Sequence, residues 1–316
     1  MSEVIARQSP WGPLRIADAH VHFFSYRFFE ILSTQKPGLT LDAVRSELLK
    51  KPEIYFPPEH PEQLADLWAR HLDRHGVDRA ALIASLPGDE ASVLAAAHAH
   101  PDRFLPFAMV KPKAWKPEAW KPEALAGVRA ACLFPAMHAY SMRDDLVDPV
   151  FAWAEKGGRA VFVHCGVLSV GIRKRLGLSS AFDLRYSNPV DLHGAALRHP
   201  DVPIIIPHFG AGFLREALML ADLCPNVYLD TSSSNGWIRY QEGVPDLRQV
   251  FRRAIEVVGV ERLLFGTDSS FFPRGWHHQI FDEQATALYE IGVSEADARG
   301  IFGENLLRIL PPSTNV

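Results

Sequence analysis

The sequence has few cysteines, no long hydrophobic run and no excess of basic charge. Its 316 residues include 3 cysteines, Cys132, Cys165 and Cys224, which form no CxxC motif. Three cysteines cannot all pair, so we expect no disulfide framework and predict reduced residues of the core. No apolar run reaches the roughly 18 residues that a membrane-spanning helix needs, so we expect no membrane association of that kind.

The charges of the chain are nearly balanced. Lys and Arg number 33 and Asp and Glu 37, so the formal net charge is -4. Nucleic acids and anionic membrane surfaces are bound through strong positive fields, which this composition does not supply. The first residues, MSEVIARQSPWGP, show neither a basic start with an apolar core nor a twin-arginine pair, so we expect a cytoplasmic protein.

Eight short apolar runs rich in β-branched residues recur along the chain, with helical patterns between them. This alternation predicts repeated βα units around a parallel sheet, whose buried strands are almost continuously apolar. We therefore predict an α/β fold, a (β/α)8 TIM barrel forming one domain over residues 1–316, with an open doubly wound sheet as the competing architecture. The predicted strands are LRIADAHV from Leu14, RAALIASL from Arg79, FLPFAMV from Phe104, VRAACLF from Val128, AVFVHCG from Ala160, PIIIPHF from Pro203, VYLDTS from Val227 and RLLFGTD from Arg262.

Three connections between the predicted elements are too long for simple turns. They span approximately residues 23–61, 166–188 and 269–279. Connections of this length in a barrel usually form lids or the walls of a binding site. We therefore interpret the three segments as lid insertions of a single barrel domain rather than as linkers between domains.

Polar side chains stand at the ends of four predicted strands. His20 and His22 end the first strand, in IADAHVHF, and point the same way because side chains alternate along a strand. His164 ends the fifth strand, His208 the sixth and Asp268 the eighth. In a barrel these positions meet at one mouth, and imidazole and carboxylate groups suit zinc and other divalent transition ions. We predict a metal centre in which four of these residues hold the ion and the fifth handles protons, although each histidine alone is more typical of a hydrogen-bonded core residue.

The motifs carrying these residues resemble a known family. IADAHVHF, VFVHCG, PHFGAG, LLFGTDSSF and IFGENLLRIL are similar, in order and spacing, to motifs of the amidohydrolase superfamily. The resemblance is closest to the amidohydrolase 2 branch, which includes relatives of aminocarboxymuconate semialdehyde decarboxylase. It implies that His20, His22, His164 and Asp268 bind one divalent metal ion and that His208 and Asp268 are catalytic. Zinc is the expected metal, and manganese, iron or cobalt can share this ligand set.

One departure from the superfamily pattern bears on the number of metal ions. Members with two metals commonly bridge them with a modified lysine at the end of the fourth strand, where relatives often read KLHP. This sequence has Cys132-Leu133-Phe134-Pro135 instead, so we expect a single ion. The neighbouring Met137, His138 and Tyr140 are interpreted as pocket wall, with a packed loop as the alternative.

Three functions are compatible with these residues. The leading prediction is a metal-dependent hydrolase, in which a metal-activated water attacks a small carbonyl substrate such as a lactone or an amide. Asp268 would accept the water proton, and His208 would orient the water or stabilise the oxyanion. The alternative is a non-oxidative decarboxylase (a carboxy-lyase) acting on an unsaturated or aromatic carboxylic acid. A barrel that binds a partner around a structural ion is the third interpretation.

The expected partner is a small molecule. Aromatic stretches at HFFSYRFFE and SFFPRGWHHQIF, the second of which contains Trp276, suggest a largely apolar pocket or lids that pack on each other. A carboxylate substrate would favour a guanidinium group in the lids, while solvated loop charge is the competing interpretation. A homo-oligomer is left open. The candidate arginines are Arg27, Arg173, Arg175, Arg185 and Arg274.

Overall fold

The computed structural model describes residues 5–50, 54–114, 125–180, 182–232, 236–243 and 246–311. A short antiparallel hairpin precedes the main sheet and consists of β1 (Arg7–Ser9) and β2 (Gly12–Leu14). In the described part of the chain, no helix combines the length and the apolar character that crossing a membrane requires.

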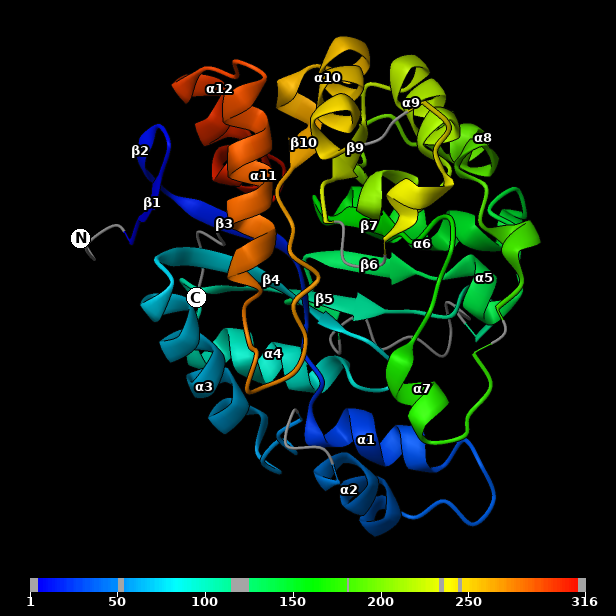
Figure 1. Ribbon diagram of the computed structural model, residues 1–316. Coiled ribbons are helices and arrows are strands. Elements are labelled where there is room, and N and C mark those ends of the chain that lie inside the picture. The colour runs from blue at the N-terminus through cyan, green and yellow to red at the C-terminus, as the bar shows by residue number, and fades with distance from the viewer. Residues whose placement is uncertain are drawn as a thin grey trace.

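Eight parallel strands form the centre of the molecule, each within or overlapping one of the eight predicted runs (Figure 1). Neighbours in sequence are neighbours in the sheet from first to last, as in a TIM barrel. The (β/α)8 prediction is confirmed over the open doubly wound sheet. The strands are β3 (Ile16–His22), β4 (Val77–Ala84), β5 (Phe104–Met109), β6 (Ala130–Leu133), β7 (Ala160–Val163), β8 (Ile204–Ile206), β9 (Val227–Asp230) and β10 (Leu263–Leu264).

The barrel closes between the first and last parallel strands through the segment that follows β10. The Ala19 N–H donates to the Phe265 carbonyl and the His22 N–H to the Ser269 carbonyl, each at 2.8 Å. Val21 and Ser269 form a parallel bridge. Only two residues of the last strand, β10, pair regularly with β9. The residues that follow, up to Ser269, pair with β3 and complete the ring.

Helices cover the outside of the barrel (Figure 1). The proline after Asp148 lies in the first turn of α6. The buried residues of α10 are apolar, and its N-cap Asp246 accepts from the Gln249 N–H at 3.1 Å. The helices outside the insertions are α3 (Pro61–Arg74), α4 (Glu90–Ala99), α5 (Pro135–His138), α6 (Asp148–Lys156), α8 (His193–Arg198), α9 (Leu214–Leu223), α10 (Leu247–Val258), α11 (His278–Glu290), α12 (Glu295–Arg299) and α13 (Asn305–Ile309).

Alternate residues along the strands contribute to two hydrophobic clusters. On β4, Ala80 and Leu82 belong to the larger cluster with the surrounding helices, whereas Ala81 and Ile83 belong to a second cluster with the opposite side chains of the other strands. This alternation is expected for strands buried on both faces. The three cysteines are buried and free, which confirms the sequence prediction.

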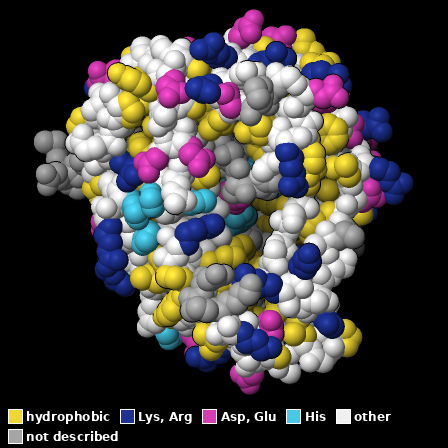
Figure 2. Space-filling model, in the orientation of Figure 1, with side chains coloured by type: hydrophobic (Ala, Val, Ile, Leu, Met, Phe, Trp, Pro, Cys, Tyr) yellow, Lys and Arg dark blue, Asp and Glu magenta, His cyan; other side chains and the backbone are white. Residues whose placement is uncertain are grey.

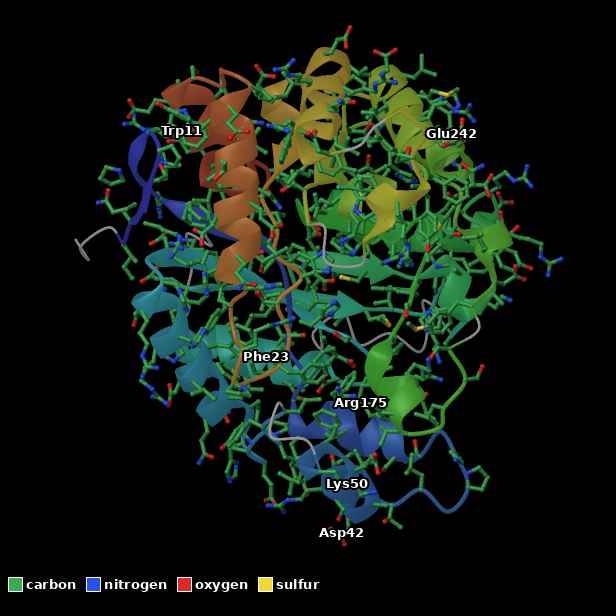
Figure 3. All side chains as sticks on the ribbon, in the orientation of Figure 1. Trp11, Phe23, Asp42, Lys50, Arg175 and Glu242 are labelled. Carbon is green, nitrogen blue, oxygen red and sulfur yellow. The ribbon has the colours of Figure 1, made fainter. Side chains whose placement is uncertain are left out.

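The first two long insertions contain short helices of their own: α1 (Tyr26–Ser33), α2 (Leu41–Leu49) and α7 (Gly171–Arg175). Figure 3 labels Arg175 on α7 and Asp42 and Lys50 at α2, on either side of α1. Their apolar side chains form a third hydrophobic cluster, which we call the cap cluster. Its buried members are Phe28, Phe29, Leu32, Val44, Leu48, Ile54, Phe56, Leu86, Ile172, Leu176 and Leu178.

Candidate metal centre

Three of the predicted ligands meet at the carboxyl ends of the barrel strands. The Nε2 atoms of His20 and His22 lie 3.4 Å apart, and the Asp268 Oδ1 lies 3.4 Å from the first and 3.0 Å from the second. One ligand atom from each of the three residues lies within 4.8 Å of the others. Two imidazole nitrogens and a carboxylate oxygen therefore point at one small volume, which suits a divalent ion.

Backbone irregularities bring these side chains together. The pairing of β3 with β4 shifts register between Asp18 and Val21, which changes the regular alternation next to His20. Asp268 has a φ of 55°, in the left-handed region that costs a non-glycine residue about 1 kcal/mol or more. His208, at the end of β8, has the same φ of 55°. Strained backbone at strand ends is typical of positions selected for function.

Two of these histidines are held by hydrogen bonds from the other ring nitrogen. His20 Nδ1 lies 2.6 Å from Asp230 Oδ2, and His22 Nδ1 lies 2.7 Å from the Ser85 hydroxyl oxygen, which itself donates to the Ile83 carbonyl. A proton on Nδ1 satisfies both contacts and leaves each Nε2 with a free lone pair. Such outer partners fix the tautomer and the ring orientation of a metal-binding histidine.

Sequence reasoning missed Asp230 as a site residue, although it ends a predicted strand like the residues that were identified. Burial raises the pKa of Asp230, but the adjacent His20 outweighs this and holds the pKa below its usual value. Burial lowers the pKa of His20, and the charges of Asp230 and Asp268 overcome this and raise it to about 9. The buried carboxylate of Asp230 and the partly buried one of Asp268 thus favour a positive charge beside them, which a proton or a cation can supply.

His208 lies beside His20, where the sequence predicted a proton-handling group. The two rings have centroids 4.9 Å apart. His208 Nδ1 lies 2.8 Å from the Ser232 hydroxyl and 3.1 Å from the Ser232 carbonyl, and that hydroxyl is also 3.2 Å from His20 Nδ1. Burial and the charge of His20 lower the pKa of His208, so its ring is neutral at ordinary pH. Ser232, which was not predicted, bridges the two rings.

His164 is near this group, although it is not among the three clustered ligands. Its ring lies 5.4 Å from the His208 ring and stacks on Phe134 at 5.3 Å between centroids. The side chain is 3% exposed, and its Nδ1 has no hydrogen-bond partner among the described residues. Burial and the charges of His208 and His20 hold its pKa well below the usual value. A neutral, buried imidazole nitrogen without a partner fits a metal ligand, so the donor set as a whole fits a single ion.

Aromatic side chains from two insertions cover one side of the centre. Phe24 stacks on His22 with centroids 5.3 Å apart, and Phe271 stacks on Phe24 at 4.6 Å. In the view of Figure 2, histidine side chains lie among hydrophobic and basic side chains near the middle of the molecule. Trp276, by contrast, is fully buried and donates from Nε1 to Asp18 Oδ2 at 2.8 Å, so it ties the third insertion to β3.

The candidate arginines differ in their distance from the centre. Burial lowers the pKa of Arg274, and the nearby carboxylate of Asp268 opposes this, so the two charges attract each other. Arg27 and Arg185 each pair with an acidic residue two or three positions away. Arg173 donates to the Ser179 carbonyl at 2.8 Å, within the second insertion. Arg274 is therefore the candidate arginine whose charge acts on Asp268, and it donates to the Ser270 hydroxyl at 3.0 Å.

Comparison with known proteins agrees with this architecture. The family model described as amidohydrolase (Amidohydro_2) matches residues 17–311. The chain therefore belongs to this amidohydrolase family, as its motifs suggested. Protein fluG of Emericella nidulans is 34% identical over 91 residues, which make up 29% of this chain and 10% of that protein. The match thus spans about one tenth of the length of that relative.

Solved structures share the barrel at low sequence identity. A 5-carboxyvanillate decarboxylase from Novosphingobium aromaticivorans, complexed with manganese and a substituted nitrobenzoic acid, is 14% identical with a TM-score of 0.61, covering 98% of this chain and 99% of that chain. A probable 2-pyrone-4,6-dicarboxylic acid hydrolase from Acinetobacter baumannii with bound citric acid is 15% identical with a TM-score of 0.59, covering 94% and 99%. At these identities the likeness shows the fold, and both reaction classes occur on it.

Proposed function

We propose that this protein is a metal-dependent hydrolase that acts on a small carbonyl substrate bearing a carboxylate. The observation that carries the proposal is the convergence of the His20 Nε2, His22 Nε2 and Asp268 Oδ1 atoms next to His208 at the barrel mouth. His20, His22, His164 and Asp268 would hold one ion, zinc by preference, with manganese, iron or cobalt sharing the donor set. Manganese in the solved structure of the Novosphingobium decarboxylase supports a divalent ion at such a site.

The side chains of this centre would have different roles in hydrolysis. A divalent ion held here supplies polarisation of the substrate carbonyl and activation of a water molecule. Asp268 has a pKa held well below its usual value by His20 and His22 despite burial, so it is ionised and can receive a proton. His208 donates from Nδ1 to the Ser232 carbonyl, so its neutral ring presents the Nε2 lone pair, which can orient the attacking water by accepting its proton. Stabilising the oxyanion would require His208 to carry a proton on Nε2 as well. Asp230 keeps the His20 ring in place.

A decarboxylase is the second candidate, and Arg274 is the observation that favours it. A guanidinium beside Asp268 could hold the carboxylate that leaves as carbon dioxide. The same carboxylate contact also serves a hydrolase whose substrate is a carboxylated lactone, so Arg274 alone does not decide between the two. We retain hydrolysis as the proposal because His20, His22 and Asp268 converge as donors that can activate a water, whereas no single lid arginine is compelling as a carboxylate clamp. A barrel that binds without turnover is the weakest candidate, since the donor set includes no cysteine of a closed structural site.

Product analysis in labelled water tests the reaction class. The protein with its metal is incubated with lactones, amides and carboxylated aromatic acids in heavy-oxygen water and, separately, in deuterium oxide. Hydrolysis places a solvent oxygen in the product carboxylate or alcohol, as mass spectrometry would show. Deuterium on carbon with release of carbon dioxide and no solvent oxygen would overturn the hydrolase and establish the lyase. Binding without any turnover would favour the non-catalytic barrel.

We also propose that residues 1–316 act as one domain in which the insertions at about 23–61, 166–188 and 269–279 cover the barrel mouth. The cap cluster supports this, because it joins α1 and α2 to α7 and packs against Phe271 of the third insertion. The cytoplasmic location and the question of a homo-oligomer stay as predicted from the sequence.

A further inference from the structure

A second cavity opens at the carboxyl ends of β5 and β6, on the same face of the barrel as the metal centre. Its volume is about 400 Å³, which is the size of a small-molecule site. The segment 111–114 after β5 forms one wall, and α5 with the residues after it forms the other. Met137, His138 and Tyr140, which the sequence offered as pocket wall or packed loop, line it. We call it the Lys111 cavity.

The walls of the Lys111 cavity offer hydrogen-bond donors that the described part of the protein leaves unused. Tyr140 is 1% exposed, and its hydroxyl has no hydrogen-bond partner among the described residues. The buried Nδ1 of His138 has none there either. A buried polar atom without a partner costs about 1–3 kcal/mol, so unpaired atoms of this kind need a reason. A ligand that accepts hydrogen bonds supplies one.

The charge of the cavity is positive. Lys111 and Lys113 both line it, and none of its lining residues in the described part of the chain is acidic. Lys113 donates from Nζ to the Ala139 carbonyl at 2.8 Å, which fixes it to the end of α5. Lys111 forms no salt bridge with another described residue within 4.0 Å, so its ammonium is available to a ligand. An ammonium, a phenol and an imidazole around an apolar wall suit the carboxylate of an organic acid.

Direct packing connects this cavity to the metal centre. Phe134, which precedes α5, stacks on His164, and its carbonyl accepts from the His138 N–H at 3.0 Å. Met137 packs against the second hydrophobic cluster, which also contains Phe134 and the Phe162 that touches the His20 ring. Phe134 therefore touches His164 with its ring and is hydrogen-bonded through its backbone to His138, which lines the cavity. A molecule with two functional groups can place one at the metal centre and the other in the cavity.

We propose that the Lys111 cavity binds a carboxylate of the substrate that does not react, while the reacting group lies at the metal centre. Lys111 pairs with the carboxylate, the Tyr140 hydroxyl donates to it and Met137 contacts the carbon skeleton. The substrate class is then an organic acid with a second carbonyl or carboxyl group several bonds from the first. This inference rests on the proposed function, since the metal centre must hold the other end. If the metal centre carries out the reaction, the Lys111 cavity determines which substrates bind and not which reaction occurs.

Two fluorinated probes separate the cavity from the metal centre. The full chain with its metal is titrated with 3-fluorobenzoate, which has one carboxylate, and with 5-fluoroisophthalate, which has two, and binding is followed by fluorine NMR. The dicarboxylate should bind more tightly to the unmodified protein. Lys111→Met should weaken the dicarboxylate about ten-fold or more and leave the monocarboxylate unchanged, because only the second carboxylate reaches the cavity. Lys111→Arg, which keeps the positive charge, should retain much of the preference for 5-fluoroisophthalate over 3-fluorobenzoate.

The matched control is Lys156→Met, which makes the same change at an exposed position at the end of α6. It should leave both affinities as they are. Equal affinities for the dicarboxylate before and after Lys111→Met would overturn the proposal, as would an equal loss for both probes. If metal-ligand variants abolish turnover while Lys111→Met does not change the preference, the proposed function stands and the cavity assignment fails.

Tyr140→Phe provides a second test with two readouts. Removing a buried hydroxyl that has no hydrogen-bond partner among the described residues should leave the unfolding midpoint unchanged or raise it. The same variant should weaken 5-fluoroisophthalate several-fold and spare 3-fluorobenzoate. Unchanged affinity for both probes would show that the hydroxyl plays no part in binding and would contradict its place in the proposal.

Discussion

The metal centre and the Lys111 cavity occupy one barrel face, but their polar atoms are arranged in opposite ways. At the metal centre, the outer nitrogens of His20, His22 and His208 are tied to Asp230, Ser85 and Ser232. In the cavity, the Tyr140 hydroxyl and His138 Nδ1 have no partner among the described residues. The first place gathers a buried and a partly buried carboxylate, which suit a cation, and the second presents a lysine, which suits an anion. Under the two proposals made above, the protein organises the ion site in advance, whereas the site for the unreacting part of the substrate leaves donors open to the ligand.

The largest expected effect comes from removing a proposed ligand. His20→Ala or His164→Ala should reduce bound metal to a small fraction of one equivalent and abolish turnover, because each removes an imidazole nitrogen from a single-ion site. Elemental analysis of the purified variants measures this. His98→Ala, an exposed position on α4, is the control and should keep its metal. Full metal content in both variants would refute the ligand assignment.

The next effect concerns His208, which we place beside the ion rather than on it. His208→Asn should retain metal and lose turnover by about 10²–10⁴-fold, the range for a lost acid–base or oxyanion group. Elemental analysis and initial rates on the same preparation check both parts. Loss of metal in this variant would move His208 into the ligand set.

A smaller effect is expected at Asp230, which acts through His20. Asp230→Asn keeps the shape of the side chain and removes its charge, so the His20 ring loses its charged acceptor. Metal affinity should fall about 10–100-fold, as for other outer partners of metal ligands. Competition with a chelator of known affinity measures it. The exposed Asp201→Asn should behave like the unmodified protein, and an Asp230→Asn variant that does the same would show that the contact is only structural.

The smallest effect uses Asp89, a buried carboxylate without a histidine beside it. Ser25 and Ser92 donate to its Oδ1, and burial raises its pKa from 3.8 to about 7. Between about pH 4 and 7 the folded protein therefore binds a proton that the unfolded chain does not, so the stability contributed by this group falls as the pH rises.

In Asp89→Asn this contribution to the pH dependence should disappear. Between pH 5 and 7 the free energy of unfolding of the unmodified protein should fall by about 2 kcal/mol more than that of the variant. Denaturant melts at the two pH values measure it, with the exposed Asp222→Asn as the control. An unchanged pH dependence would show that the serine hydroxyls stabilise the ionised carboxylate fully.

Particular residues explain which parts of this site the sequence could predict. The apolar runs that precede His164 and His208 predict buried strands, and parallel strands in a barrel bring their ends to one mouth. Asp230 satisfies the same rule, but its role depends on a hydrogen bond to His20 across the barrel, which no local pattern encodes. The register shift next to His20 and the left-handed backbone at Asp268 are also set by tertiary packing. Lys111 and Tyr140 become neighbours only because β5 and β6 pair side by side.

The way in which the barrel closes gives the metal centre a mechanical consequence. His20 and His22 come from the first strand of the ring, and Asp268 lies in the segment that completes it, so the candidate ligands face each other across the joint where the two ends of the barrel sequence meet. Backbone hydrogen bonds at Ala19 and His22 hold that joint. An ion bound by both sides would cross-link residues that are separated by most of the sequence. A cross-link between such distant residues restricts the unfolded chain more than a local contact does. Loss of the ion would thus weaken the contact between β3 and the segment after β10 first. The part of the barrel most prone to local unfolding would then be the part that carries the candidate ligands.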